Sequence, residues 1–305
     1  MTIESNLRSG YIAIVGRPNV GKSTLLNALV GEKVSIVSSK PHTTRHRILG
    51  VQSGSSYQAV FMDTPGLQNV TKGYQKRAIH RVMAKTINQV IEDADVILLV
   101  IDANKLTQDD LNLGGLLKER SEEVVLALNK IDTVGPRTAL LPVLDKVSQQ
   151  LPFSAFVPIS ALKVINLDSL MSEIVVRLPF GPALFPKDIL TDKGDSFRIA
   201  EIIREKLLSV VHKEVPYGLT VEVEYVGRNE ENQWLIHAVI WVERPSHKAI
   251  VIGKHGRLLK KAGQSARQEL IKFLNDRVHL ELWVKVREHW SDNERELKKL
   301  GFDLS

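Results

Sequence analysis

The sequence has 305 residues, of which 43% are hydrophobic and 25% charged, and this is enough for two domains that each bury a core. It contains no cysteine, which excludes disulfides and thiolate metal sites. It has no run of about 18 apolar residues, so we predict no membrane span. Residues 1–10 lack the apolar core of a signal peptide and the pattern of an organelle-targeting segment, so we expect neither export nor import. The nine histidines show no metal-ligand spacing, and we predict no zinc site.

A phosphate-binding loop is predicted near the start of the chain. Residues 16–23 read GRPNVGKS and fit G-x-x-x-x-G-K-[ST] between an apolar run and a helix-like segment, the context in which this pattern is specific. We expect Lys22 to reach the β- and γ-phosphates and Ser23 to place its hydroxyl on Mg²⁺. A plain glycine turn is the alternative, and four matched residues argue against it. The predicted nucleotide contacts in this loop are Gly16, Arg17, Pro18, Asn19, Val20, Gly21, Lys22, Ser23 and Thr24.

Two further segments are predicted to sense the terminal phosphate. Residues 41–47 have no helical or strand period and are read as a mobile loop, in which Thr43 and Thr44 are both candidates to close over the γ-phosphate and Mg²⁺; we favour Thr44. After the strand 57–62 comes Asp63-Thr64-Pro65-Gly66, which is predicted to contact the nucleotide. There Asp63 would hold Mg²⁺ through water, and the N–H of Gly66 would contact the γ-phosphate. The predicted catalytic residues are Lys22, Thr44 and Gly66, and the predicted metal ligands are Ser23, Thr44 and Asp63.

Leu67 follows Gly66, where Ras-like enzymes carry a glutamine that orients the attacking water. A leucine side chain neither donates nor accepts a hydrogen bond. Intrinsic hydrolysis is therefore expected to be slow, unless another group, a cation or a partner places the water. Gln68 lies one residue too late to be assigned this role.

The base is predicted to be guanine. The apolar strand 122–128 ends in Asn129-Lys130-Ile131-Asp132, in which the aspartate accepts from the ring N1–H and the exocyclic amine of guanine, a pair of donors that adenine lacks. Two charge-assisted bonds of ~1.5–3 kcal/mol give roughly 10²- to 10⁴-fold preference for GTP over ATP. After the strand 155–159, backbone N–H groups of Ser160, Ala161 and Leu162 are expected near the guanine carbonyl.

Residues 1–178 therefore form a predicted α/β domain, a P-loop GTPase domain with a mostly parallel sheet and helices on both faces. Its expected strands are 11–15, 47–52, 57–62, 95–101, 122–128 and 155–159, and a helix over 167–178 closes it. Residues 179–195, with three prolines and a glycine in its first part, are predicted to be a semi-rigid linker.

Residues 196–305 are predicted to form an α+β KH domain of type II with a C-terminal helix. Helical and strand periods follow the order helix, strand, strand, helix, helix, strand, and the turn Gly253-Lys254-His255-Gly256 joins the last two helices. A bare G-x-x-G is usually an ordinary turn. Here it lies in the segment 244–272, which contains eight basic residues and one acidic residue. This segment therefore has a net charge of +7, in a chain whose total net charge is +6. We predict RNA contacts at Ile252, Gly253, Lys254, His255, Gly256, Arg257, Lys260 and Lys261, and we expect Trp234, Trp241 and Trp283 to lie in the core rather than to stack on bases.

Taken together, these motifs resemble the Era family of bacterial GTPases over essentially the whole chain. The family-like stretches are residues 16–23, 43–47, 63–67 and 279–286, together with the G-x-x-G turn. The resemblance implies a Mg²⁺-dependent GTPase that binds GTP and GDP and attaches to the 3′ end of 16S ribosomal RNA through its KH domain. It also implies a role in maturation of the small (30S) ribosomal subunit and slow intrinsic hydrolysis.

The resemblance carries further expectations. A cytoplasmic protein is implied, with peripheral attachment to the inner face of the cell membrane, and we expect a monomer. An asparagine placed like Asn19 helps related GTPases to bind an activating K⁺. The family often has a histidine where this chain has Gln68.

Two hypotheses remain open at this point. In the first, the protein is a GTP-hydrolysing switch whose loops at Thr44 and Gly66 gate RNA binding. In the second, it is an RNA-binding assembly factor in which the nucleotide is mainly structural and turnover is incidental. A third, an ATP-dependent P-loop enzyme, conflicts with the guanine-reading pattern.

Overall fold

The computed structural model describes residues 7–40, 43–66, 77–135, 137–212 and 215–302. The chain divides into two compact units. The first lies within residues 1–35, 44–74 and 83–192, and the second within 36–43, 75–82 and 193–305. Each unit has a sheet and a hydrophobic core of its own.

The first unit is built on a six-stranded sheet with the order β2-β3-β1-β4-β5-β6. The β2–β3 pair is antiparallel, and the other pairs are parallel. The strands are β1 (Arg8–Val15), β2 (Ile48–Ser53), β3 (Tyr57–Asp63), β4 (Val96–Asp102), β5 (Val124–Asn129) and β6 (Ala155–Pro158). The central strand β4 is buried along Val96–Ile101, as expected of a parallel strand covered on both faces. The predicted α/β fold of this half is confirmed.

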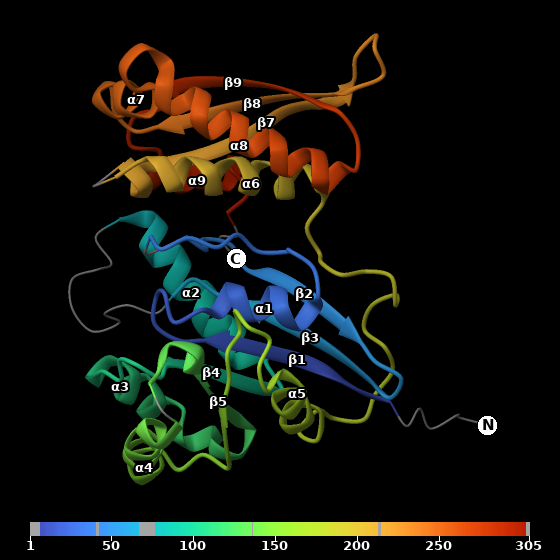
Figure 1. The fold of residues 1–305 in the computed structure, drawn as a ribbon, viewed down its shortest axis with the longest axis vertical. Helices are drawn as coiled ribbons and strands as arrows, with labels where there is room; N and C mark the ends of the chain where they lie inside the picture. The colour runs from blue at the N-terminus through green and yellow to red at the C-terminus, as the bar shows by residue number, and fades with distance from the viewer. Residues whose placement is uncertain (1–6, 41–42, 67–76, 136, 213–214, 303–305) are drawn as a thin grey trace. The chain divides into compact units, whose positions relative to one another are not determined.

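Helices cover both faces of this sheet (Figure 1). They are α1 (Lys22–Val30), α2 (Ala78–Asp93), α3 (Gln108–Leu116), α4 (Leu141–Gln150) and α5 (Leu167–Val175). One face packs against apolar side chains of α2, α3 and α4, among them Val90, Leu113 and Val147. Helix α1 contacts β1, β2 and β3, α5 contacts β5 and β6, and both lie in front of the sheet in the view shown.

Strand ends bring the predicted nucleotide residues to one edge of this sheet. Asp63 ends β3 and Asn129 ends β5, while the loop from Gly16 follows β1 and Ser160 follows β6. Because parallel strands point the same way, their carboxyl ends share an edge, where α/β proteins bind ligands.

The proline-rich segment that was predicted to be a linker lies along the first unit as far as Asp192. The N–H of Ser9 donates to the carbonyl of Pro179, and the N–H of Val51 donates to that of Leu190. The Gln58 side chain accepts from two successive N–H groups at 184 and 185. Prolines cannot continue a helix, and here they keep the chain extended against the strands.

The second unit has a three-stranded sheet in the order β7-β8-β9, with β7–β8 antiparallel and β8–β9 parallel. Its elements are α6 (Asp195–Val210), β7 (Leu219–Arg228), β8 (Trp234–Val242), α7 (Pro245–Ile252), α8 (Arg257–Leu274), β9 (Val278–Val286) and α9 (Glu294–Lys299). Their order confirms the predicted α+β arrangement. Apolar side chains of α6, α7 and α8, such as Ile203, Val251 and Ala266, pack against the sheet.

Short 3-10 turns complete the described chain. They are Lys118–Glu123, Ile131–Thr133, Arg137–Leu140, Val215–Gly218, Lys254–Gly256 and Trp290–Asp292. The second of these turns contains Asp132, and the fifth is the G-x-x-G turn, so two of the predicted sites have defined local geometry.

Candidate functional site

The loop at residues 16–23 surrounds the amine of Lys22. Lys22 is buried, and its Nζ donates to the carbonyls of Gly16 at 3.0 Å and Arg17 at 2.9 Å, which leaves its third proton for a phosphate. Burial lowers the pKa of Lys22 to about 8, against the opposing charge of Asp63. Gly21 has φ +102° at the N-terminal cap of α1, a conformation that favours glycine. The loop therefore presents helix N–H groups and one buried cation, the arrangement that binds phosphates.

The predicted metal ligands come together. Ser23 Oγ donates to Asp63 Oδ2 at 2.7 Å and lies 3.0 Å from Thr44 Oγ1. Asp63 is fully buried, its Oδ1 has no hydrogen-bond partner among the described residues, and burial raises the pKa of its carboxyl group. Hydroxyl and carboxylate oxygens are the donors that Mg²⁺ prefers, so this set fits the ion.

The two adjacent threonines point to different partners. The hydroxyl of Thr43 donates to the carbonyl of Lys40 at 2.7 Å, whereas that of Thr44 meets Ser23. This arrangement supports the choice of Thr44 over Thr43 as the ligand.

The D-T-P-G turn lies against the phosphate-binding loop. Thr64 Oγ1 donates to the carbonyl of Ile14 at 2.8 Å and so fixes the turn to β1. A Cβ at Gly66 would come within 2.7 Å of Pro18 N, so only glycine fits this approach. Leu67 and Gln68, whose sequence prompted the expectation of slow hydrolysis, lie outside the described residues.

The guanine-reading residues form a connected set. Asn129 Nδ2 donates to the carbonyl of Val20, and Asn129 Oδ1 accepts from the N–H of Ala161, both at 2.9 Å. Ser160 Oγ donates to Asp132 Oδ1 at 2.6 Å. Asn129 thus ties the phosphate loop to the last loop, and Ser160 orients the exposed carboxylate of Asp132. The Ala161 N–H, which was predicted to face the guanine carbonyl, donates to Asn129, and Leu162 is 70% exposed.

Lys130 is held by a carboxylate that sequence reasoning did not find. Its Nζ donates to Asp102 Oδ2 at 2.7 Å and to the carbonyl of Asn19 at 2.6 Å. Burial acts to raise the pKa of Asp102, but the hydrogen bond and charge of Lys130 outweigh it and lower that pKa. Asn19, the residue associated with K⁺ by resemblance, has φ +64°.

Two buried polar residues, Ser35 and Asp110, and the half-buried Asn27 were also missed. Ser35 Oγ donates to Asp63 Oδ2 at 3.0 Å, and Asn27 Oδ1 accepts from the N–H groups of Val34 and Ser35. Asp110, which is 1% exposed, accepts from Arg17 Nε at 2.6 Å. For Asn27 the sequence did contain a signal, because it is a polar residue within the apolar part of α1.

The G-x-x-G turn has the backbone that its glycines permit. Gly253 has φ +71° and Gly256 has φ +73°, between the end of α7 and the start of α8. A Cβ on Gly253 would lie 2.7 Å from Leu258 Cγ, whereas one on Gly256 would meet nothing within 4 Å. The turn is therefore open on the side of Gly256, where a backbone can approach closely.

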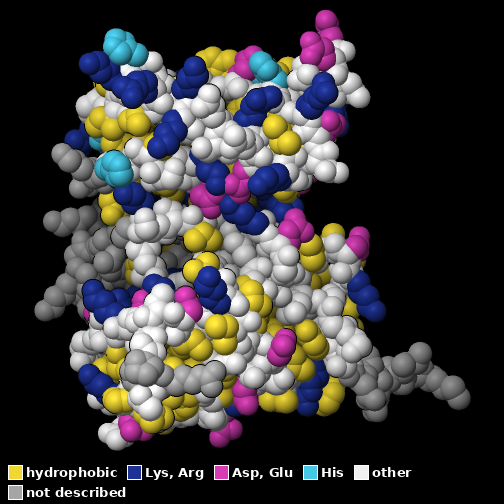
Figure 2. Space-filling model, in the orientation of Figure 1, with side chains coloured by type: hydrophobic (Ala, Val, Ile, Leu, Met, Phe, Trp, Pro, Cys, Tyr) yellow, Lys and Arg dark blue, Asp and Glu magenta, His cyan; other side chains and the backbone are white. Residues whose placement is uncertain are grey.

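Basic side chains surround this turn. Figure 2 shows Lys and Arg side chains over α7 and α8. The eight predicted RNA contacts run from Ile252, at the end of α7, through the turn to Lys261, near the start of α8. Five of them have exposed side chains: Lys254, His255, Arg257, Lys260 and Lys261. Ile252 is half-buried, with its neighbour Ile250 45% exposed.

The expectation that the three strand tryptophans lie in the core is wrong for Trp283. Trp234 packs against the core cluster and Trp241 is half-buried, but Trp283 is 41% exposed. Helices cover one face of the three-stranded sheet, and Trp283 points to the other face, with His237 5.3 Å away in an edge-on contact.

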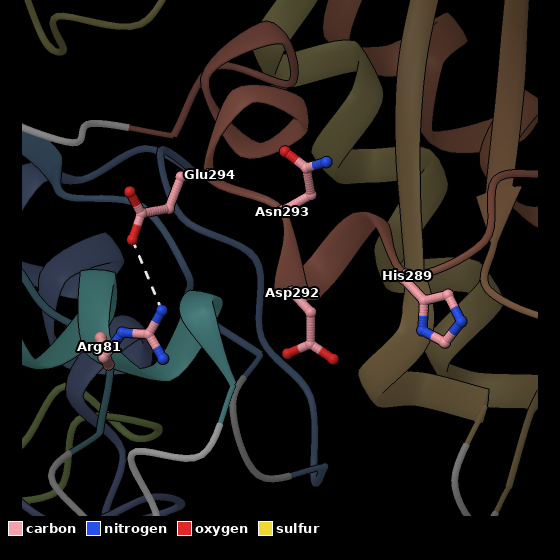
Figure 3. Close-up of a pocket in the computed structure, with 5 residues that line it drawn as sticks. All are labelled: Arg81, His289, Asp292, Asn293 and Glu294. Atoms are coloured by element: carbon pink, nitrogen blue, oxygen red, sulfur yellow. Dashed lines mark ion pairs between the residues drawn. The ribbon is translucent and has the colours of Figure 1, made fainter.

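A pocket of about 470 Å³ is lined by none of the residues predicted for the nucleotide or the RNA (Figure 3). It is lined by Arg81, His289, Asp292, Asn293 and Glu294. Arg81 and Glu294 form an ion pair at 3.5 Å, and Asn293 caps α9. We assign no ligand to the pocket.

Comparison with known proteins decides the family. Residues 11–130 match the family described as 50S ribosome-binding GTPase, and residues 214–291 match the KH domain family. GTPase Era of Yersinia enterocolitica is 45% identical over 293 residues, which cover 96% of this chain and 95% of that protein. The chain belongs to the Era family of GTPases. GTPase Era of Yersinia pestis strain Pestoides F matches with the same identity and coverage.

Solved Era structures have the same fold over the whole chain. Two match with a TM-score of 0.92 and 40% identity, covering 98% of this chain and 100% of theirs. One is an Era variant of Aquifex aeolicus bound to GDP·AlF4⁻, and the other is Era in complex with MgGDPNP and nucleotides 1506–1542 of 16S ribosomal RNA. The predicted family, fold class and GTPase activity are thereby confirmed. Within the described part of the chain, no helix has the length and apolar character needed to cross a membrane.

Proposed function

We propose that this Era-family GTPase binds the 3′ region of 16S ribosomal RNA through its KH unit and assists assembly of the 30S subunit, with the bound nucleotide controlling its hold on RNA. The observation that carries this proposal is the full-length match to an Era structure that holds MgGDPNP and 16S ribosomal RNA together. Both halves of that match are supported by the residues present here.

The nucleotide half of the proposal rests on the oxygen cluster and the guanine set. Ser23, Thr44 and Asp63 would hold Mg²⁺, the last through water, and Asp63 Oδ1, which has no partner among the described residues, is available to accept from that water. When bound, Mg²⁺ supplies charge neutralisation at the β- and γ-phosphates. Lys22 donates to these phosphates, and Asn129 and Asp132 select guanine.

The timing of the switch follows from which groups reach the terminal phosphate. In this proposal Thr44 and the Gly66 N–H contact the γ-phosphate, so they lose a partner on hydrolysis. Leu67 offers no hydrogen bond to water. We therefore expect slow turnover without RNA.

The RNA half rests on the open G-x-x-G turn and its basic side chains. Gly256 leaves room for a sugar-phosphate backbone, and exposed cations such as Lys254 and Arg257 neutralise phosphates. Single-stranded RNA fits this turn better than a duplex, because KH domains clamp about four nucleotides there.

RNA affinity in different nucleotide states tests the switch. We expect the full chain to bind a 3′-terminal 16S RNA fragment at least several-fold more tightly with Mg²⁺ and a non-hydrolysable GTP analogue than with GDP. Fluorescence anisotropy with labelled RNA measures this difference. Equal affinities with analogue, GDP and no nucleotide would instead support an assembly factor in which the nucleotide is structural.

Three family traits complete the proposal by resemblance alone. We infer a monomer that acts in the cytoplasm, with peripheral contact to the membrane, and activation by K⁺ near Asn19. Comparing GTP turnover in K⁺ with that in Na⁺ at equal ionic strength tests the last of these.

A further inference from the structure

Helix α6 holds both ends of the segment that precedes Thr44. The N–H of Val37 donates to Glu205 Oε1 at 2.9 Å, and Arg204 Nη2 donates to the carbonyl of Thr43. Residues 36–43 and α6 belong to the same compact unit. Two consecutive side chains of one helix therefore fix the start and the end of this segment.

The guanidinium of Arg204 has little freedom to move. Arg204 is 1% exposed, and its Nε and Nη2 donate to the two oxygens of Glu201 at 2.7 Å each, one helical turn away. A forked pair of this kind fixes the plane of the guanidinium as well as its position. The remaining nitrogen, Nη1, is buried and has no hydrogen-bond partner in the part of the chain that the structure describes.

Stability alone is a poor explanation for this buried pair. Removing two charges from water is costly, and well-packed apolar residues in place of a buried ion pair are often neutral or stabilising. The unsatisfied Nη1 adds to that cost. What an apolar pair could not supply is the directional hydrogen bond from Arg204 to the carbonyl of Thr43.

That hydrogen bond reaches Thr44 through a single peptide unit. The carbonyl of Thr43 and the nitrogen and Cα of Thr44 lie in one plane, because the peptide bond is planar. Fixing the Thr43 carbonyl therefore orients the backbone that carries Thr44, whose Oγ1 lies 3.0 Å from Ser23 Oγ. The Thr43 side chain turns away to Lys40 and does not compete for this place.

We propose that Arg204, oriented by Glu201, is a positioning residue for GTP hydrolysis, which sets the place of the Thr44 hydroxyl at the Mg²⁺ and γ-phosphate site. The inference rests on the proposed role of Thr44. It predicts an effect confined to the triphosphate state, since GDP offers Thr44 no γ-phosphate.

The test compares Arg204→Met/Glu201→Leu with the unaltered full chain. The double change removes both members of the pair, so neither is left buried without the other. We expect kcat for GTP hydrolysis without RNA to fall about tenfold, the loss that one charge-assisted hydrogen bond accounts for. The Mg²⁺ concentration at half-maximal rate should rise, while affinity for GDP stays within about twofold, since the phosphate and guanine contacts are untouched.

The conservative variant and a matched control make the result decisive. Arg204→Lys keeps the charge but not the planar fork, and we expect it to lower kcat less than the double change does. This variant also tests the inference if the double variant does not fold. Arg177→Met removes an arginine that likewise bonds a glutamate one turn away, Glu173, and backbone carbonyls, and it should leave kcat unchanged.

Two outcomes would overturn the inference. In the first, kcat and its Mg²⁺ dependence are unchanged in Arg204→Lys and in any double variant that folds. In the second, the variants lose affinity for GDP and for the GTP analogue equally, which indicates a merely structural role. Thr44→Ala separates this from a failure of the proposed function. If Thr44→Ala leaves kcat unchanged, the role of Thr44 itself is wrong, and if it lowers kcat while the Arg204 variants do not, the positioning role alone fails.

Discussion

At the scale of single residues, the guanine site depends on how one exposed carboxylate is held. Asp132 offers two oxygens to a base, and Ser160 Oγ bonds one of them at 2.6 Å and so limits its rotation. Asn129 meanwhile fixes the phosphate loop through Val20 and the last loop through Ala161. Base selection is therefore a matter of donor and acceptor matching at Asp132, on a frame that Asn129 keeps rigid.

Replacing this carboxylate should change which base is bound. In Asp132→Asn the side chain gains donors and loses charge, so it no longer matches the two donors of guanine but matches the extra carbonyl of xanthine. Affinity for GTP should fall by roughly 10²-fold or more, and xanthosine triphosphate should become the better substrate. Competition against a fluorescent GDP measures both. Unchanged GTP preference would revive the ATP-dependent or unspecific P-loop alternatives.

The buried amine of Lys22 makes nucleotide binding sensitive to pH. Its pKa in the free protein is lowered to about 8. Phosphates favour the charged amine, so this pKa is higher in the complex. The affinity for nucleotide should then be constant at pH values below the pKa of Lys22 in the free protein. Between that pKa and the higher pKa of the complex, it should fall by up to about tenfold per pH unit.

Titration of GDP affinity between pH 7 and pH 9.5 checks this dependence. Ionisation of the guanine ring also weakens binding at high pH, so Lys22→Met is the control that retains the ring effect and lacks the amine. A parallel decline in both proteins would contradict a perturbed Lys22.

At the scale of elements, the G-x-x-G turn shows why two glycines are not equivalent. Both have φ near +70°, but the space beside Gly253 is filled by Leu258, whereas that beside Gly256 is open. The first glycine allows α7 and α8 to pack closely, and the second leaves a surface for a ligand. These four residues therefore let the two helices pack closely and also leave a surface that a ligand can reach.

A carboxylate in this turn should weaken RNA binding selectively. Gly253→Asp introduces strain at positive φ, a contact with Leu258 and a negative charge beside Lys254. We expect RNA affinity to fall at least tenfold, while GTP hydrolysis without RNA is unchanged. Gly301→Asp, which adds the same charge at another glycine with φ +80° and open space, should leave RNA affinity nearly intact.

Salt dependence gives an independent measure of the same element. If the basic side chains around the turn contact phosphates, log Kd should rise with log salt with a slope of about 0.7 per phosphate neutralised on single-stranded RNA. RNA binding that is insensitive to salt would contradict an electrostatic role for this cluster.

At the scale of the whole molecule, the chain has two units with separate cores. One core lies around β4 and β5, and the other lies between β8 and the helices α6 and α8. Each predicted ligand interacts with one of them: the guanine and phosphate residues lie in the first, and the G-x-x-G turn lies in the second. GDP, which offers Thr44 and Gly66 no γ-phosphate, should therefore stabilise the first unit without the second, and RNA in the absence of nucleotide should stabilise the second without the first.

Thermal unfolding followed by calorimetry tests this division. Mg²⁺ with GDP at a hundredfold excess over Kd should stabilise the first unit by about 2.7 kcal/mol and raise its transition, and an RNA fragment should raise the other. A single transition that either ligand shifts as a whole would contradict independent stabilisation.

Local chemistry determined much of this protein from its sequence. The phosphate loop, the D-T-P-G turn, the N-K-x-D segment and the G-x-x-G turn are patterns of neighbouring residues, and strand or helix periods placed each of them correctly. The strand predicted over 57–62 matches β3 (Tyr57–Asp63) to within one residue. These features depend on contacts within a few residues, and the sequence displays such contacts directly.

Tertiary structure alone decided the partners of the buried polar groups. Ser35 meets Asp63 across 28 positions and Arg204 meets Thr43 across 161, and no local period records either pairing. Trp283 is a different case, because it alternates with His279, Glu281 and Lys285 and lies opposite the apolar residues of β9 that face the helices, so the strand period already indicates its exposure. The physical reason for the first two pairings is that a hydrogen bond depends on what the folded chain brings alongside, and short-range sequence patterns do not contain that information.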